Sequence, residues 1–185
     1  MTKSIANQAW EKVSINEVVY AFLAGEYEKC VNSLGQLAHI HKKLFTNPNL
    51  DDESQNHMRS MLLCYRIGIM SMIPLSTKWY KVSAINESHY NELFAINDKD
   101  WNSPNDNNEL IKVAKRMNFN LDKDPSEWEL PILWGKSMNG PFTIIEGNHR
   151  FSAIALTDKK LNIPCYIGVS DDPCPWFSGV GQGKK

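Results

Sequence analysis

Five consecutive residues, Glu146-Gly147-Asn148-His149-Arg150, combine side chains that can bind anions and transfer protons. Arg150 can hold phosphate oxygens in a bidentate fork, and His149 can donate a hydrogen bond or carry a proton near neutral pH. Gly147 has no Cβ to obstruct a phosphate and tolerates a positive φ, and the amide of Asn148 can donate to an anionic oxygen. Glu146 can act as a base, orient His149 or contact a metal ion. The pattern predicts a phosphate-binding turn, called here the 146–150 turn, with Glu146, His149 and Arg150 as its catalytic side chains.

The flanking residues place this turn between a strand and a helix. Residues 142–145 are an aromatic and β-branched run that predicts a buried strand, and residues 151–156 have helical character. At such a junction the first N–H groups of the helix have no partner within it, and the helix dipole favours negative charge. The alternative interpretation is an ordinary turn, in which Glu146 pairs with Arg150 and His149 caps the helix.

Periodicity divides the rest of the chain into a helical part and a mixed part. Helical spacing through residues 14–72 predicts two or three packed helices. The first is expected to be capped by Ser14 or Asn16 and to break or kink at Gly25. A second apolar run covers residues 27–45, and another helix is expected to start near residue 51. After residue 73 we expect strands at 78–82, 130–134, 142–145 and 162–169, a helix from Asn86 to Phe94, a loop at 97–108 and a short helix at 109–117. The strands at 130–134 and 142–145 are expected to form a hairpin.

Composition narrows the class of protein. The chain has 185 residues, 42% of them hydrophobic, and a formal net charge of -1, which differs from a strongly basic DNA-coating protein. We expect neither a secretory signal nor a membrane span. The four cysteines lack Cys-x-x-Cys spacing and histidines at ligand spacing, so no metal site is predicted among them. Structural thiols and a cytoplasmic location fit this pattern best. The cysteines are Cys30, Cys64, Cys165 and Cys174.

Residues 144–153 resemble the signature of the ParB/sulfiredoxin-like superfamily. In that signature an acidic or small residue, a glycine and one or two variable residues precede an arginine, which is followed by an aromatic or aliphatic residue and an alanine. The strand at 79–82 and the helix from Asn86 resemble the family's first box. The resemblance implies a small ParB/sulfiredoxin-like α/β domain with a mixed sheet at 73–170. It does not cover residues 1–72, where periodicity predicts an N-terminal helical region, or residues 171–185, whose composition is typical of a C-terminal tail. Together these predictions describe an α+β chain.

The turn is more similar to some branches of this superfamily than to others. Sulfiredoxins have a catalytic cysteine where this chain has Asn148, so sulfinic-acid reduction is not expected. Partition proteins that hydrolyse CTP have two successive arginines and a downstream helix-turn-helix, whereas this turn has only Arg150. The turn is closer to the acidic-Gly-His-His-Arg turn of the free serine kinases, and the chain is similar in length to plasmid fertility-inhibition proteins, which resemble ATPases with DNase activity. The resemblance therefore implies an ATPase or small phosphotransferase that uses ATP or another nucleotide with Mg²⁺.

Two other functions stay open. Lys112, Lys115 and Arg116, with Trp101 and Trp128 in flanking loops, can track phosphates and stack on bases, as in a DNA-directed nuclease or an inhibitor of a DNA-transfer or defence system. A solvated helix face is the favoured interpretation of these residues, so DNA is not the favoured partner. The third function is a non-catalytic module that senses nucleotide through the turn and binds a protein partner through the N-terminal helices.

Overall fold

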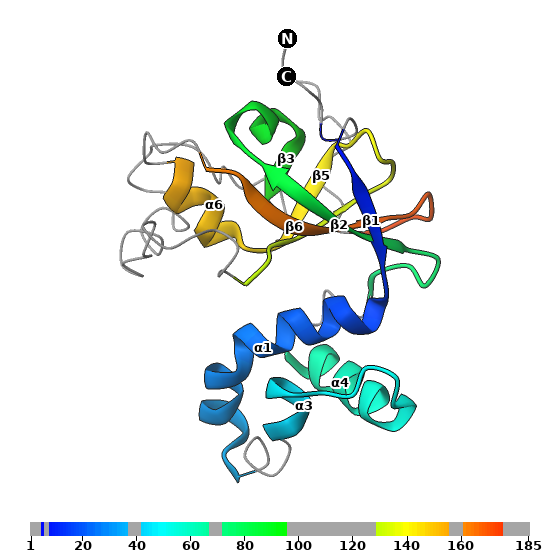
Figure 1. Cartoon of the computed structure of the whole chain (residues 1–185), viewed down its shortest axis with the longest axis vertical. Coiled ribbons are helices and arrows are strands. Elements are labelled where there is room, and N and C mark those ends of the chain that lie inside the picture. Colours follow the sequence, from blue (N-terminus) through cyan, green and yellow to red (C-terminus); the bar gives the residue numbers. More distant parts are fainter. Residues whose placement is uncertain are drawn as a thin grey trace. The chain divides into compact units, whose positions relative to one another are not determined.

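The computed structural model describes residue 5 and residues 8–36, 42–66, 72–95, 129–155 and 161–175 (Figure 1). The chain divides into a helical unit, Val13–Ile73, and a sheet unit, made of Met1–Lys12 and Pro74–Lys185. The boundary at Pro74 lies where the residue pattern changes from helical to strand-like. The first twelve residues group with the sheet unit, whereas the sequence placed them with the helices.

The helical unit contains three described α-helices, which are α1 (Ile15–Leu34), α3 (Lys42–Thr46) and α4 (Glu53–Arg66). Helix α1 contacts both α3 and α4. Its buried apolar side chains lie at helical spacing, and the rings of Tyr27 and Phe45 meet at 5.3 Å between centroids. The buried apolar residues of these helices are Val18, Val19, Phe22, Leu23, Leu44, Phe45 and Leu63.

The ends of α1 partly differ from the sequence prediction. The predicted cap at Ser14 is confirmed, because its side-chain oxygen accepts from the Glu17 N–H at 3.1 Å. The predicted break at Gly25 is wrong, since α1 continues through it to Gly35. A glycine inside a helix costs only about 1 kcal/mol, which packing of the apolar face outweighs. At Gly35 the backbone has φ 54 and its N–H bonds to the Val31 carbonyl at 2.9 Å, so 27–45 is not one helix.

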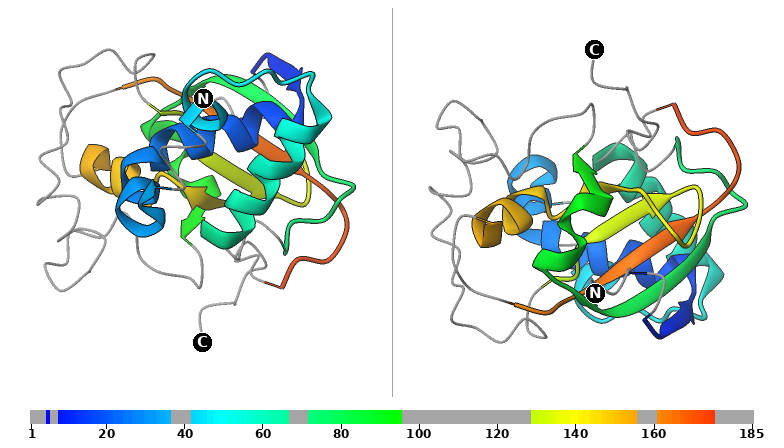
Figure 2. Two further views of the ribbon diagram at one scale, coloured as in Figure 1. Left: turned by 90° about the horizontal axis from the view of Figure 1, so that it is seen from below. Right: turned by 90° about the horizontal axis from the view of Figure 1, so that it is seen from above.

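The sheet unit is built on a six-stranded mixed sheet, so the predicted mixture of helices with a mixed sheet is confirmed. Its strand order is β1-β2-β6-β4-β5-β3. The β2–β6 and β4–β5 pairs are antiparallel, and the β4–β6 and β3–β5 pairs are parallel. In the right-hand view of Figure 2, orange β6 lies between the long green β2 and the yellow-green strands β4 and β5. The elements are β1 (Trp10–Val13), β2 (Lys78–Ile85), the 3-10 helix η3 (Glu87–Glu92), β3 (Leu93–Ala95), β4 (Ile132–Gly135), β5 (Phe142–Glu146), α6 (Asn148–Ala155) and β6 (Ile163–Val169).

The hairpin that leads into the turn forms as predicted. Strands β4 and β5 pair with Trp134 opposite Thr143, and the same ladder places Ile132 opposite Glu146. Asn86 caps η3 as expected, but Leu93 and Phe94 belong to strand β3 and not to a helix. Leu93 is extended because its side chain enters the core and its backbone pairs with β5. The loop predicted at 97–108 and the helix at 109–117 lie outside the described residues.

One apolar cluster fixes α6 on the sheet. Phe151 and Ile154 of α6 share this cluster with Leu133 of β4 and with Phe142 and Ile144 of β5. Because successive strand residues face opposite sides, Trp134 lies on the other face, where its indole N–H donates to the Thr77 hydroxyl at 3.2 Å. Packing of Phe151 and Ile154 in the core therefore fixes α6 directly after the 146–150 turn.

The described cysteines of the sheet unit match the structural interpretation. Cys165 and Cys174 are buried free thiols, and burial raises the pKa of Cys165 well above its ordinary value. The side chains of Cys30 and Cys64 lie outside the described part of the structure. Among the described helices, none combines the length and the apolar character needed to cross a membrane.

Candidate functional site

The turn between β5 and α6 depends on glycine at position 147. Gly147 has φ 99, a conformation that side-chain-bearing residues rarely adopt, and its carbonyl accepts the Phe151 N–H at 3.0 Å, which closes the first turn of α6. A Cβ at this position would lie 2.7 Å from the Cβ of Pro131. From the sequence this glycine was expected to leave room for a phosphate and to tolerate a positive φ, and the positive φ is confirmed. In the structure the close neighbour is Pro131, so backbone conformation and internal packing both require it.

The start of α6 differs from the starts of α1 and α4 in its capping residue. Ser14 supplies a side-chain oxygen to the first turn of α1, and the Asp52 carboxylate accepts the Gln55 N–H at 3.0 Å in α4. Gly147 has no side chain with which to cap the N–H groups of α6. The positive end of the helix dipole is thus presented without a side-chain oxygen from the capping position.

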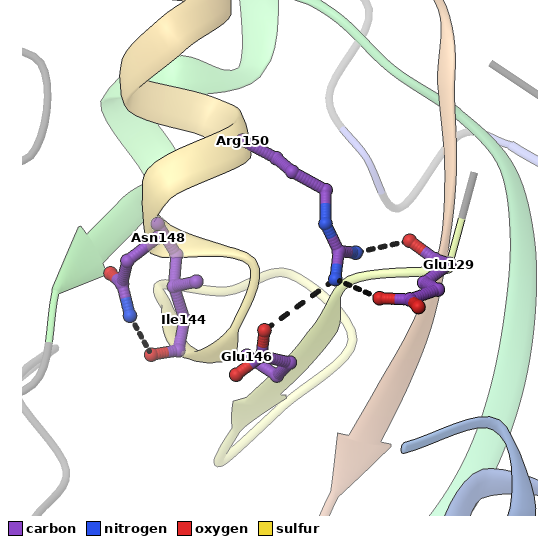
Figure 3. Close-up of polar contacts among 5 residues, drawn as sticks. All are labelled: Glu129, Ile144, Glu146, Asn148 and Arg150. Atoms are coloured by element: carbon purple, nitrogen blue, oxygen red, sulfur yellow. Dashed lines mark hydrogen bonds and ion pairs between the residues drawn. The ribbon is translucent and has the colours of Figure 1, made fainter. Parts of the chain in front are cut away.

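Arg150 lies between two carboxylates (Figure 3). Its Nη2 is 3.1 Å from Oε2 of Glu129 and 3.5 Å from Oε1 of Glu146, and its Nη1 donates to the backbone carbonyl of Glu129. The Arg150 side chain is only 11% exposed, whereas those of Glu129 and Glu146 are 52% and 32% exposed. Among described residues, these contacts use three of the five N–H groups of the guanidinium. The Glu146–Arg150 pair is the contact that the ordinary-turn interpretation expects.

Asn148 points away from this cluster. Its amide nitrogen donates to the Ile144 carbonyl at 3.3 Å, and Figure 3 shows its side chain on the opposite side of the helix start from Arg150. Residues two apart on a helix are separated by about 200°, so their side chains face apart. The carbonyl oxygen of the amide is buried, and within the described residues it has no hydrogen-bond partner. His149, the next helical residue, is partly exposed.

The structure therefore brings Glu146 and Arg150 together and leaves the Asn148 side chain outside their cluster. It adds Glu129, which the sequence interpretation missed. The signal for Glu129 lies in the hairpin, because pairing of Ile132 with Glu146 directs residues 129–131 toward the start of α6. Extending the predicted hairpin strand, 130–134, by one residue would have reached Glu129.

Asp172, just after β6, takes part in a separate set of hydrogen bonds. Asp172 accepts from the Ser76 hydroxyl, and its own N–H donates to the Ser170 hydroxyl at 3.1 Å, which is turn chemistry after β6. In the described ranges, no group of three or more His, Cys, Asp or Glu side chains is placed to hold a metal ion. The residues suggested for DNA binding, Trp101, Lys112, Lys115, Arg116 and Trp128, are outside the described residues.

Comparisons of the chain with family models, with curated proteins and with solved structures gave no match. The resemblance to the ParB/sulfiredoxin-like superfamily therefore depends on residues 144–153 and on the elements around them, and it stays a prediction. The fold and the site together define a mixed α/β protein with a strand–glycine–helix turn at the end of a buried hairpin.

Proposed function

We propose that this chain binds nucleotides and acts as an ATPase or small phosphotransferase, with the 146–150 turn holding the phosphates of ATP or another nucleotide. The observation that carries the proposal is Gly147 at φ 99, which joins β5 to α6 without a capping side chain, next to the guanidinium of Arg150. Helix starts of this kind bind phosphate through their N–H groups and dipole. The resemblance of residues 144–153 to the ParB/sulfiredoxin-like signature supports the same assignment.

In this proposal the backbone N–H groups and Arg150 bind different oxygens of the same phosphate. The N–H groups of the first turn of α6 hold one oxygen, and the guanidinium neutralises the charge on the others. Arg150 is held in place by the Glu129 carbonyl, and this contact positions its side chain beside the helix start. Asn148 contributes its backbone N–H, because its side chain is directed to the Ile144 carbonyl.

The chemistry needs little more than positioning and charge. Transfer of the terminal phosphoryl group breaks its bond to the bridging oxygen and forms a bond to water or to an acceptor hydroxyl, whose proton passes to Glu146 or His149. Glu146 is 32% exposed at the end of β5, so its carboxylate fits a role with Mg²⁺, which favours one or two carboxylates together with phosphate oxygens. Bound Mg²⁺ would supply charge neutralisation across the phosphates.

A thermal-shift panel of ATP, ADP, CTP and GTP, each with Mg²⁺, tests the ligand class, and turnover of the nucleotide that binds tests the activity. We expect a selective shift in the wild-type chain that Arg150→Ala abolishes, with kcat/KM lowered at least ~30-fold, or ~2 kcal/mol. Lys78→Ala, which removes an exposed cation of β2, is the matched control and should keep both properties. Equal turnover by the wild-type and Arg150→Ala chains would overturn the proposal.

A non-catalytic nucleotide sensor that binds a protein partner is the second candidate. The observation in its favour is the mutual pairing of Glu146 and Arg150, which engages the proposed proton-handling and charge-stabilising groups with each other. In the helical unit Met61 and Met72 are 62% and 54% exposed, as adaptable contact residues would be. Tight nucleotide binding without turnover would favour this candidate. The DNA-directed alternative is tested by a mobility-shift assay, in which absence of binding at ~50 mM salt would contradict it.

A further inference from the structure

Glu129 holds Arg150 through two separate groups, and the difference between them suggests regulation of the turn. The backbone carbonyl of Glu129 accepts from Nη1, and its carboxylate lies 3.1 Å from Nη2. We propose that the Glu129 carboxylate competes with phosphate for Arg150 and thereby sets the affinity of the 146–150 turn for its ligand. This inference rests on the proposed phosphate-binding function.

Exposure decides which member of the pair can move. The Glu129 side chain is 52% exposed, so it can turn into solvent and keep its hydration, whereas the Arg150 side chain is 11% exposed and needs an anion beside it. A phosphate oxygen uses the same N–H donors as a carboxylate oxygen. Replacing one by the other exchanges anions without leaving the guanidinium unpaired.

The carbonyl contact keeps Arg150 in place during such an exchange. It belongs to the backbone just before β4, and Pro131 beside it packs against Gly147. The arginine therefore stays at the helix start when the Glu129 side chain leaves. Glu146 is a weaker competitor by geometry, because its carboxylate is 3.5 Å from Nη2 and its backbone is fixed as the last residue of strand β5.

The test is calorimetric titration of the full chain with Mg²⁺-ATP and with inorganic tripolyphosphate, which carries phosphates but no base. We expect Glu129→Gln to lower Kd for both ligands about five-fold, the factor associated with removing one exposed ion pair. Glu129→Ala removes the carboxylate but keeps the carbonyl, and it should give the same change. Glu11→Gln, at an exposed position of β1, is the matched control and should leave Kd unchanged.

The outcomes separate this inference from the function on which it rests. Wild-type binding with an unchanged or increased Kd in both Glu129 variants would overturn the competition and leave phosphate binding intact. Absence of binding in the wild type and in both variants, all folded by circular dichroism, would overturn the competition together with the proposed function. A gain for ATP alone, without a gain for tripolyphosphate, would also overturn it, because the competition acts on phosphate oxygens.

Discussion

Each unit of the molecule contains an arginine that is largely or fully buried, and the two are held by different kinds of partner. Arg59 of α4 is 0% exposed, and its Nη2 donates to the Asn49 carbonyl at 3.1 Å and to the Asn56 side-chain oxygen. Both acceptors are neutral. Arg150 of α6 instead meets two carboxylates, and the closer one, Glu129, is half exposed.

The difference separates an arginine that organises a loop from one that can exchange its anion. Asn49 belongs to the chain between α3 and α4, and Asn56 of α4 is tied to the same segment because its amide donates to the Leu50 carbonyl at 2.7 Å. Burial lowers the pKa of Arg59, and its Nε and Nη1 have no hydrogen-bond partner in the part of the chain that the structure describes, so its surroundings are costly for a cation. Its partners cannot leave without moving the loop. The carboxylate partner of Arg150 can leave by a side-chain rotation.

The largest expected effect comes from the residue that fixes the position of Arg150. Gly147→Ala should destabilise the sheet unit by about 4 kcal/mol, because a strained φ and a crowded Cβ each cost about 1–3 kcal/mol. The added methyl group would lie 2.7 Å from the Cβ of Pro131. Urea unfolding followed by tryptophan fluorescence measures the loss.

Gly35 provides the matched control for this substitution. Its φ is 54, but apart from its immediate chain neighbours no atom of the described residues lies within 4 Å of the position that a Cβ would take. Gly35→Ala should therefore cost only the conformational strain, about 1–2 kcal/mol. Equal costs at the two positions would show that contact with Pro131 does not hold the turn.

The second largest loss of stability is expected for substitution of Arg59. Arg59→Ala should destabilise the helical unit by about 3 kcal/mol, because it leaves a cavity and two acceptors without their donor. Arg59→Met keeps most of the apolar volume and removes a poorly compensated charge, so about 1 kcal/mol is expected. Urea unfolding followed by circular dichroism at 222 nm compares the two. Equal stabilities of the Ala and Met variants would contradict a packing role for the side chain.

Elements with a strong apolar pattern were predictable from sequence, and short edge elements were not. Strands β4, β5 and β6 are buried runs bounded by turn residues, so the apolar pattern and the flanking turn residues indicate the same strands. Strand β1 contains exposed Glu11 and Lys12 between partly buried ends and offers no such signal. Strand β3 has three residues and follows η3 without a break, so Leu93 and Phe94 continue a helical pattern in the sequence. Pairing with β5 decides their conformation.

The candidate site shows the same limit. The 146–150 turn was found because its residues are contiguous, and a local pattern contains that information. Glu129 was missed because its contact with Arg150 depends on hairpin register across 21 positions. The direction of the Asn148 side chain depends on where α6 begins. The sequence placed helical character from Phe151, whereas the helix starts at Asn148, so the opposite placement of Asn148 and Arg150 was not foreseen.

A smaller effect on stability is expected at Arg150 than at Arg59, and this contrast tests the comparison directly. Arg150→Ala should cost the sheet unit about 1 kcal/mol, because its carboxylate partners are partly exposed and regain water when the guanidinium is removed. Urea unfolding followed by tryptophan fluorescence measures it, with Lys78→Ala as the surface control. A loss as large as that of Arg59→Ala would identify Arg150 as a structural arginine and contradict the distinction between the two.

The smallest expected effect is the loss of stability at acid pH when Asp52, which caps α4, becomes protonated. The backbone N–H of Gln55, followed by its side-chain amide, holds the pKa of Asp52 below its ordinary value of 3.8, and the charge of Arg59 adds to this. Because the folded pKa lies below the unfolded one, the stabilisation is complete above the unfolded value and is lost as pH falls through the folded value. Asp52→Asn keeps a capping acceptor but removes the titration, so its stability should depend less on pH below 4 in urea unfolding at pH 7, 5, 4 and 3.

Gln55→Ala tests how much of this acid dependence comes from the side-chain hydrogen bond to Asp52. It removes the side-chain donor, which lies 2.8 Å from Oδ2 of Asp52, and leaves the backbone N–H in place. Since the backbone bond is the larger cause of the lowered pKa, most of the acid dependence should survive in this variant. Arg59→Met should preserve still more of it, because the charge of Arg59 is the smallest contribution. If Arg59→Met removed the acid dependence as fully as Asp52→Asn, Arg59 would be acting as the ionic partner of Asp52, and the contrast with the carboxylate-bound Arg150 would fail.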